Sequence, residues 1–391
     1  MVRAYVRGLQ GAKLGPDSVA AMVKHFPGGG PQKDGEDPHF AHGKEQVYPG
    51  GMRDYHLAPF KAAIEAGCSQ MMPYYGQPVG TDWEEVGFGF NRDVLTGLLR
   101  GRLGFDGIIC TDWGLLNEAP VLGELFPARA WGAEHLSVAE CAAKALDAGS
   151  DQFGGEQCPD VIVELVRSGR ITEARIDASV RRLLRGKFVL GLFENPCVDP
   201  DRAEEVVGAS EFTALGEAAQ RRSLTVLTNQ DLLPLQGRPN LGRQRAGGVG
   251  VRQRGRRPRR RGSGRAAAAD PVRGAARALR VLLPLRFARL PRGRVEGDPA
   301  AARQHAHAGV RPSGATRRAP EIAAKAAALV ADYGASDAAL LEVAFGRARA
   351  EGRLPFELPR SMTAVAASRP DVPDDTEDPV FPYGHGVALQ G

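Results

Sequence analysis

The stretch Gly107-Ile108-Ile109-Cys110-Thr111-Asp112-Trp113 decides the fold. Its first five residues are largely apolar, and a run of this kind without alternation is typical of a strand buried on both faces of a parallel sheet. Two similar runs precede it, at residues 19–23 and 68–72, and a weaker one follows near residues 151–153. Polar residues stand at the ends of the first three runs. The carboxyl edge of the predicted sheet therefore carries the candidate functional groups.

Helical patterns alternate with these runs. The segments 91–102, 138–148 and 160–168 each place apolar side chains on one face at helical spacing. Thr172 is typical of a helix N-cap, and the helix that it begins is expected to close at Gly191. Strands that alternate with helices indicate βα units, as in a (β/α) barrel or an open α/β sheet.

The composition divides the chain into three zones. Residues 1–200 hold the βα units and end in a segment, 195–200, that is typical of a linker. A second α/β zone is predicted for residues 201–240 and 320–391. The segment 241–319 between its two parts is rich in Arg, Ala, Gly and Pro and resembles neither neighbour.

The basic charge of the protein is confined to this Arg-rich segment. The whole chain carries a net charge of +5, whereas residues 241–320 hold 21 Arg against three acidic residues, a balance of +18. The rest of the chain therefore carries +5 less +18, or −13, which is not the charge of a nucleic-acid-binding protein. Two interpretations of the segment are open: a disordered nucleic-acid-binding arm and an out-of-frame translation of a GC-rich gene. We favour the second and expect no nucleic-acid partner.

Composition also argues against several classes of protein. Five cysteines, an odd number without a Cys-x-x-Cys pair, indicate buried free thiols rather than a disulfide framework or a zinc site. No apolar run approaches the ~18 residues that a membrane span needs. The chain opens at Met1-Val2-Arg3 without the apolar region of a signal peptide. We therefore expect no membrane association and, by default, a cytoplasmic protein, while the oligomeric state stays open.

Taken singly, the residues at the strand ends have ordinary structural interpretations. An Asp directly after a strand, such as Asp112, is commonly a turn former or a helix cap. Lys24-His25 is commonly a solvated pair, and Tyr74 and Trp113 commonly pack at a core or a rim. Gly28-Gly29-Gly30 lacks the spacing of a phosphate-binding loop and is typical of a turn. A catalytic interpretation needs these residues to occur together in a known pattern.

Motifs in the order of one known family provide that pattern. Lys24-His25-Phe26-Pro27-Gly28 resembles a signature of glycoside hydrolase family 3, the β-glucosidase family. Gly104-Phe105-Asp106-Gly107, followed by Thr111-Asp112-Trp113, is similar to the nucleophile motif of that family. Its second-domain closing motifs resemble Gly352-Arg353-Leu354-Pro355-Phe356 and Phe381-Pro382-Tyr383-Gly384-His385-Gly386. The resemblance covers nearly the whole chain outside the Arg-rich segment.

This resemblance implies an α/β protein, with an incomplete TIM-type (β/α) barrel followed by an interrupted α/β sandwich domain. It implies a retaining glycosidase that releases terminal β-D-glucosyl residues through a covalent glycosyl-enzyme on Asp112. Lys24 and His25 match residues that hydrogen-bond sugar hydroxyls, and Lys24 is expected to lower the pKa of Asp112. Tyr74 and Trp113 would offer flat faces to the sugar ring. The implied partner is a β-glucoside or oligosaccharide substrate, and neither a metal nor an organic cofactor is implied.

Parts of the family pattern are missing from the sequence. The barrel of the family opens well before the strand with Lys24-His25, so the chain is expected to be truncated at its N-terminus. In the β-glucosidase branch the acid/base is a Glu of the second domain. The corresponding stretch falls in the Arg-rich segment, where Glu296 is the only Glu, and no acid/base is assigned. The N-acetylglucosaminidase branch carries an Asp-His pair in the loop after the first motif. It is not indicated, because Gly29 and Gly30 follow that motif without a His beside them.

Three alternatives to a β-glucosidase stay open. The first is a β-xylosidase or another exo-β-glycosidase on the same scaffold, because the sequence does not show the shape of the sugar subsite. The second is an inactive sugar-binding remnant that lacks its acid/base. The third, which we disfavour, is nucleic-acid binding through the Arg-rich segment. Members of the family are often exported, so the compartment is not decided.

Overall fold

The structure is a computed structural model that describes residues 1–121, 124–235 and 315–389. Two compact units can be distinguished. Unit 1 holds residues 1–203 and 363–375, and unit 2 holds residues 204–235, 315–362 and 376–389. The Arg-rich segment predicted at 241–319 lies outside the described residues except for its last few positions. The domain bounds inferred from the sequence therefore stay a prediction.

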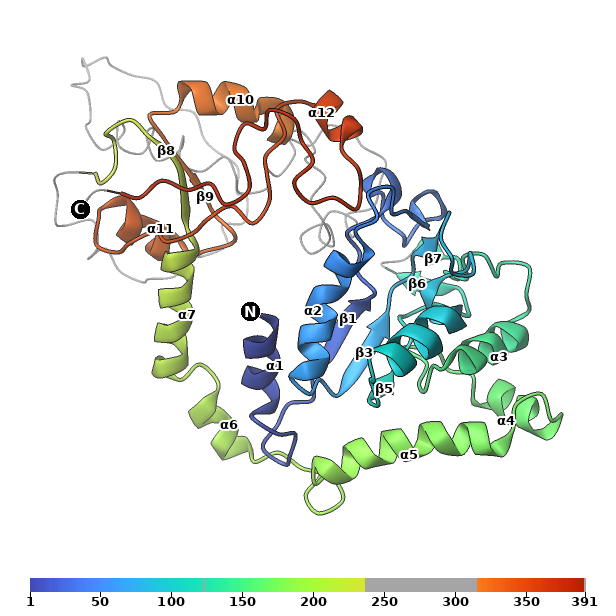
Figure 1. Cartoon of the computed structure of the whole chain (residues 1–391). Helices are drawn as coiled ribbons and strands as arrows, with labels where there is room; N and C mark the ends of the chain where they lie inside the picture. The colour runs from blue at the N-terminus through green and yellow to red at the C-terminus, as the bar shows by residue number, and fades with distance from the viewer. Residues whose placement is uncertain (122–123, 236–314, 390–391) are drawn as a thin grey trace, which may run out of the picture. The chain divides into compact units, whose positions relative to one another are not determined.

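Unit 1 is built on three parallel strands in the order β1-β3-β5 (Figure 1). They are β1 (Met22–Phe26), β3 (Gln70–Pro73) and β5 (Ile108–Ile109). A parallel bridge between Cys110 and Gln152 continues the sheet beyond β5. The strands and the bridge lie in or next to the four runs predicted from the sequence. The first strand begins at Met22 instead of residue 19, so that it runs through Lys24-His25.

Helices pack on this sheet, with α2 on β1 and α5 on β5. The helices of unit 1 and its border are α1 (Val2–Gln10), α2 (Arg53–Glu65), the π-helix η4 (Asp93–Arg102), α3 (Val138–Ala148), α4 (Pro159–Arg167), α5 (Glu173–Val189) and α6 (Pro200–Val206). Four of them confirm the predicted helical segments to within about two residues. Strands that alternate with helices in this way, without closing into a ring in the described residues, form an open part of a (β/α) barrel.

Local capping explains why two of these helices begin where they do. The side chain of Ser137 accepts the backbone N–H of Glu140, whose carboxylate accepts a bond from Ser137 in return. Such a capping box contributes about 0.5–2 kcal/mol. Gly149, at a φ of 116°, ends α3 in the left-handed conformation that favours glycine. Thr172 caps α5 by accepting the N–H of Arg175, as predicted.

The core of unit 1 lies between the strands and their helices. Phe26, Met71 and Ile109, one from each strand, are completely shielded from solvent and pack with Leu95 and Leu99 of η4. Burying a side chain of this size contributes about 1.5–3 kcal/mol. This packing fixes the strands and, with them, the positions of the residues that follow their carboxyl ends.

The loops of unit 1 contain shorter elements. These are η1 (Lys33–Gly35), η2 (Ala41–Gly43), β2 (Glu45–Gln46), β4 (Gln77–Pro78), η3 (Phe88–Phe90), β6 (Ala119–Val121) and β7 (Glu124–Phe126). β2 pairs with β4 in parallel, and β6 pairs with β7 in antiparallel orientation. They hold in place the long loops that follow β1 and β5.

Unit 2 contains one antiparallel strand pair and its helices. Its elements are α7 (Ser210–Ser223), β8 (Thr225–Asn229), α10 (Ala315–Lys325), β9 (Ala328–Ala331), α11 (Asp337–Ala344) and α12 (Met362–Ala367), the last of which continues into unit 1. Leu224, Val226 and Val330 are buried against Leu340 and Val343 of α11. Both α7 and β8 lie within residues 201–240, the first part of the second α/β zone that the sequence predicts.

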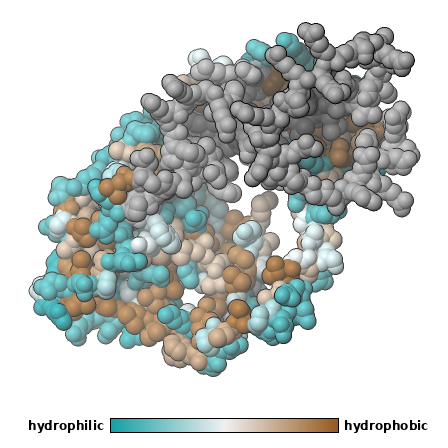
Figure 2. Space-filling view, turned by 180° about the vertical axis from the view of Figure 1, so that it is seen from behind, coloured by the Kyte–Doolittle hydropathy of each residue, from teal (hydrophilic) through white to brown (hydrophobic). Residues whose placement is uncertain are grey.

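The apolar stripe of α5 is only partly covered. Val180, Leu184 and Phe188 recur at helical spacing and are 41%, 39% and 58% exposed. Figure 2 shows hydrophobic residues gathered along the lower edge of the molecule, where α5 lies. None of the described helices combines the length and apolar character that crossing a membrane requires.

All five cysteines are free thiols, but their burial differs from the expectation. Cys68, Cys110 and Cys141 are buried, Cys158 is half-buried and Cys197 is exposed. Cys197 lies in the linker between α5 and α6, which has no regular structure to shield it. The prediction of buried thiols is therefore confirmed for Cys68, Cys110 and Cys141, and it is wrong for Cys197 in the linker.

Candidate active site

Asp112 lies just beyond the end of β5, at the carboxyl edge of the sheet. Its side chain is 13% exposed, and Oδ2 is 3.2 Å from Nε2 of His25. Oδ1 accepts the backbone N–H of Trp113 at 2.8 Å. Burial raises the pKa of Asp112, but the hydrogen bond and charge of His25, the N–H of Trp113 and the charge of His39 outweigh it and hold that pKa below its ordinary value. The carboxylate is therefore ionised near neutral pH and keeps a small part of its surface exposed.

Thr111 anchors the backbone that presents Asp112. Thr111 is fully buried, its N–H donates to the carbonyl of Gln152 at 2.9 Å, and its hydroxyl accepts the N–H of Gly154 at 2.9 Å. These bonds tie the end of β5 to the following strand position. They hold the nucleophile candidate on ordered backbone instead of a free loop, as a positioned carboxylate requires.

His25 and Tyr74 come from the ends of two neighbouring strands and face each other. Their ring centroids are 5.2 Å apart. Tyr74 is buried, and its hydroxyl accepts a hydrogen bond from Nε2 of Gln32 at 2.9 Å. Burial, followed by the nearby charges of Asp37 and Asp112, raises the pKa of Tyr74, so the phenol stays neutral. The structure therefore brings His25, Tyr74 and Asp112 together, as the sequence predicted.

Lys24 differs from the expectation. It lies exposed on β1, and the described groups that lower the pKa of Asp112 are His25, Trp113 and His39. The effect expected from the Lys24 ammonium is instead exerted by the imidazole next to it, which reaches the carboxylate directly. A contact of Lys24 with a substrate hydroxyl stays a prediction.

Trp113 presents an open aromatic face. It is 55% exposed, and the opposite face of its indole lies against the backbone of Gly154 and Gly155. A Cβ added at Gly154 would lie 2.9 Å from Cε3 of the indole, and one added at Gly155 would meet the pyrrole ring. Two consecutive glycines thus leave room for the indole to lie flat. An exposed indole held in this way can stack on the apolar face of a sugar.

Two residues near Asp112 were missed in the sequence. The hydroxyl of Tyr75 donates to the carbonyl of Trp113, and burial together with the charge of Asp112 and a hydrogen bond to it raises the pKa of Tyr75. The ring of His39 packs edge-on against Tyr75 at 4.9 Å between centroids. Nδ1 of His39 is 2.6 Å from Oδ1 of Asp37.

Asp37 and His39 thus form a pair in the loop that follows Gly28. The pair lies farther along the same loop, and only the Asp-x-His spacing in the sequence could have drawn attention to it. A carboxylate bound to one ring nitrogen orients the imidazole of His39. The loop after the first motif therefore contains an Asp-His pair, contrary to the expectation.

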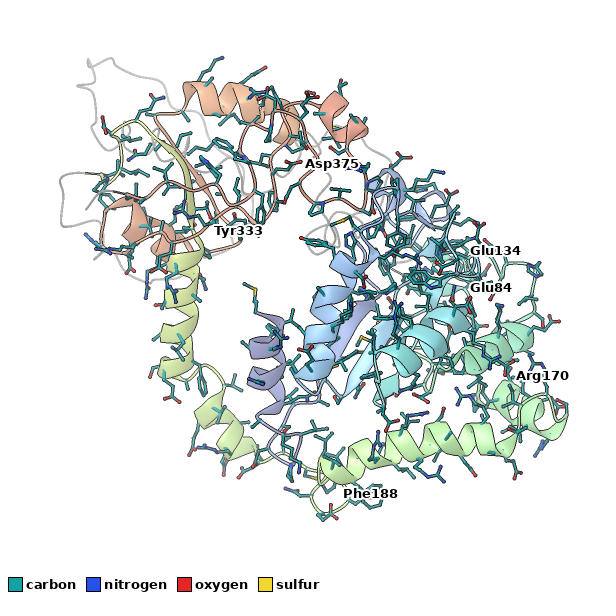
Figure 3. All side chains as sticks on the ribbon, in the orientation of Figure 1. Glu84, Glu134, Arg170, Phe188, Tyr333 and Asp375 are labelled. Atoms are coloured by element: carbon teal, nitrogen blue, oxygen red, sulfur yellow. The ribbon has the colours of Figure 1, made fainter. Side chains whose placement is uncertain are left out.

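The loop that carries His39 is attached to a second loop of unit 1. Nε1 of Trp131 donates to the carbonyl of Pro38 at 2.8 Å, and Lys44 Nζ lies 2.9 Å from Oε1 of Glu134, which is labelled in Figure 3. A half-exposed ion pair contributes little, whereas Trp131 is buried. The buried indole is therefore the main anchor that keeps His39 next to the site.

Asp151, the first residue of the weaker run near residues 151–153, does not lie at the rim of the sheet. Its side chain is completely buried, and Oδ2 accepts bonds from Arg100 and from the N–H of Ile109. Oδ1 accepts bonds from Ser179 and Arg182. Asp151 therefore holds α5 and η4 to β5. The described residues also contain no group of three His, Cys, Asp or Glu side chains that could hold a metal ion.

Comparisons with known proteins show the family to which the chain is similar. Residues 1–186 match the family model of the glycosyl hydrolase family 3 N terminal domain. The chain is 46% identical over 419 aligned residues to Beta-glucosidase C of Emericella nidulans, covering 100% of this chain and 65% of that protein. It is 35% identical to the Periplasmic beta-glucosidase/beta-xylosidase of Dickeya chrysanthemi, covering 99% of this chain and 63% of that protein. The chain thus spans less than two thirds of the length of these relatives.

A solved structure shares the fold of the described residues. The β-glucosidase involved in saponin metabolism from intestinal bacteria matches 100% of this chain and 64% of its own with a TM-score of 0.64, at 19% identity. The predicted α/β class, an incomplete TIM-type barrel followed by an α/β domain, is confirmed together with the family resemblance. Because the family model matches the barrel unit and the 46% identity extends over the whole chain, the chain belongs to glycosyl hydrolase family 3.

Proposed function

We propose that this chain belongs to a retaining β-glucosidase whose nucleophile is Asp112. The observation that carries the proposal is the ionised, partly exposed carboxylate of Asp112, held by His25 and the N–H of Trp113 at the carboxyl edge of a parallel sheet. The Emericella nidulans relative is named a β-glucosidase, which supports the same substrate class. Terminal β-D-glucosyl residues of glucosides or oligosaccharides are the proposed substrates.

The proposed reaction has two steps. One carboxylate oxygen of Asp112 attacks the anomeric carbon, the bond from that carbon to the leaving oxygen breaks, and a glycosyl ester forms. The leaving oxygen takes up one proton from a general acid. Water then attacks the same carbon, its proton passes to that group as base, and the carboxylate of Asp112 is released. The β configuration is retained because the carbon is inverted twice.

The neighbours of Asp112 have proposed roles in holding the sugar. Lys24 and His25 would donate hydrogen bonds to sugar hydroxyls, and a charged donor makes such bonds stronger. Tyr74 and Trp113 would contact the apolar faces of the ring. The acid/base is not assigned. We further propose that residues 1–200 form the barrel part, and that 201–240 with 320–391 form the second domain.

A fluorinated sugar with an activated leaving group tests the nucleophile. 2,4-Dinitrophenyl 2-deoxy-2-fluoro-β-D-glucoside needs little acid assistance, so that it labels the nucleophile even where the general acid is weak. We expect mass spectrometry to find one fluoroglucosyl group per chain, on the peptide that contains Asp112. Asp112→Asn should abolish the label, and Asp54→Asn, which changes an exposed carboxylate paired with Lys61, should leave it unchanged. A folded protein that is never labelled, or is labelled elsewhere, would refute the assignment.

A β-xylosidase is the second candidate. The Dickeya chrysanthemi relative is named a β-glucosidase/β-xylosidase, which favours a site that accepts both sugars. Nitrophenyl β-D-glucoside and β-D-xyloside differ only in the C6 hydroxymethyl group. The ratio of their kcat/KM values therefore decides between the two candidates, and a ratio above one assigns the glucosidase.

A further inference from the structure

Arg129 carries a buried positive charge without an acidic partner among the described residues. The residue is only 5% exposed, and its Nε has no hydrogen-bond partner. No carboxylate of the described part of the chain forms an ion pair with it. A guanidinium has five N–H donors. Removing such a group from water is unfavourable unless other groups replace the lost hydrogen bonds.

Two aromatic rings lie close to this guanidinium, and neither supplies an acceptor for its unsatisfied Nε. Cζ of Arg129 is 5.8 Å from the ring centroid of Tyr75 and 5.1 Å from that of Phe126. Cation–π contacts of this kind stabilise the charge. They act on the flat faces, however, and supply no acceptor for the N–H groups at the edge, where a ligand with oxygen atoms could bind.

Arg129 is also close to the catalytic centre. Its backbone N–H donates to the carbonyl of Gly114 at 2.9 Å, in the loop that continues from Asp112 and Trp113. Tyr75 lies between the guanidinium and Asp112, since its ring contacts the first and its hydroxyl the second. One side chain therefore separates Arg129 from the nucleophile candidate.

This separation indicates which part of a substrate Arg129 would contact. If Asp112 attacks C1 of a terminal sugar, and His25 and Tyr74 hold that sugar, a group beyond Tyr75 contacts a different part of the substrate. For an enzyme that removes terminal residues, that part is the leaving group. The planar fork of Arg matches the two oxygens of a carboxylate better than it matches a single hydroxyl.

We propose that Arg129 forms a subsite for a carboxylate on the leaving group, so that the preferred substrate is an acidic β-glucoside, such as a glucosyl uronic acid. This inference rests on the proposed function of Asp112. It predicts a preference that no neutral test substrate would show, because the interaction depends on the negative charge of the leaving group.

A matched pair of chromogenic glucosides tests the subsite. 4-Nitrophenyl β-D-glucoside and its 3-carboxy-4-nitrophenyl counterpart differ by one carboxylate, and both release a coloured phenolate. We expect the protein to favour the carboxylated compound at least tenfold in kcat/KM, since hydrogen bonds between charged groups have a net effect of that order. Arg129→Met should abolish this preference, because it lowers kcat/KM for the carboxylated compound far more than for the neutral one. Arg129→Lys, which keeps the charge and loses the fork, should retain part of it.

Direct binding separates failure of this inference from failure of the proposed function. Isothermal titration measures the Kd of the same two glucosides and does not depend on turnover. It uses the unaltered protein, so that the result does not depend on whether a variant folds. Tighter binding of the carboxylated compound without turnover would support the subsite and count against Asp112 as a working nucleophile. Equal affinity of the unaltered protein for both compounds would overturn the subsite. So would an equal loss on both substrates in Arg129→Met, because Arg129 would then only hold Tyr75 and Phe126 in place.

Discussion

Replacing His25 by Leu tests whether this imidazole keeps Asp112 ionised. Nε2 of His25 lies 3.2 Å from Oδ2 of Asp112, and the two side chains are 28% and 13% exposed. Burial alone raises the pKa of Asp112, and the hydrogen bond and charge of His25 are the largest factors that lower it. Without His25, the pKa of Asp112 rises. The acid limb of kcat/KM, which follows the ionisation of the nucleophile in the free protein, should therefore move to higher pH.

The size of the loss follows from the strength of that bond. A hydrogen bond to a charged group contributes about 1.5–3 kcal/mol, and each 1.36 kcal/mol corresponds to about a tenfold change in rate. At a pH where Asp112 is ionised only with His25 present, kcat/KM of His25→Leu should fall by about tenfold to a hundredfold. The loss should shrink as the pH rises and the carboxylate ionises in both proteins. A remainder that does not change with pH would report the proposed contact of His25 with the sugar.

The assay is the pH dependence of kcat/KM for 2,4-dinitrophenyl β-D-glucoside, whose leaving group makes the unassigned acid unimportant. Lys24→Leu is the matched control, because Lys24 is the exposed neighbour of His25 and is not among the main groups that lower the pKa of Asp112. It should raise KM and leave the acid limb in place. The reasoning would be refuted if the acid limb of kcat/KM did not shift in His25→Leu. It would also be refuted if the acid limb shifted by the same amount in Lys24→Leu as in His25→Leu.

Two further predictions concern stability and substrate binding. Asp151→Ala removes a completely buried carboxylate that accepts bonds from Arg100 and Arg182. The free energy of unfolding in urea should therefore fall by about 3–5 kcal/mol. The exposed Asp54→Ala should leave the urea midpoint of unfolding unchanged, and an unchanged midpoint in Asp151→Ala would contradict the role of this network. Gly155→Ala places a Cβ against the indole of Trp113 at a φ of +73°. KM should therefore rise with little change in kcat, and the rise should vanish in a Trp113→Ala background; an equal effect in both backgrounds would show that Trp113 is not involved.

Local sequence patterns were sufficient for most elements of unit 1. The helix at 138–148 and the N-cap at Thr172 were predicted as found, because capping and helical periodicity involve residues only three or four positions apart. Strand ends were less certain. β1 starts later than expected and runs through Lys24-His25, because its bounds depend on pairing with β3, which is more than forty residues away in the sequence.

The surroundings of Asp112 were predicted only in part. His25 and Tyr74 were assigned correctly to its neighbourhood, since parallel strands deliver their carboxyl ends to one edge. The sequence analysis expected Lys24 to lower the pKa of Asp112, whereas in the structure His25 has the largest such effect. The sequence alone does not show which of these two adjacent side chains reaches the carboxylate. Tyr75 and His39 were missed, since their proximity to Asp112 depends on the course of two loops.

The amino-acid sequence by itself determined the succession of strands and helices, the family and the position of one carboxylate after a buried strand. These properties follow from apolar periodicity and from motifs whose residues are close in the chain. Only the tertiary structure decided which imidazole lowers the pKa of Asp112 and that Asp151 is buried among arginines. It also decided that Arg129 is buried without an acidic partner in the part of the chain that the structure describes. Each of these properties depends on contacts between residues that are far apart in the sequence. The pKa of a carboxylate and the environment of a buried charge are set by the groups that packing brings within a few ångströms.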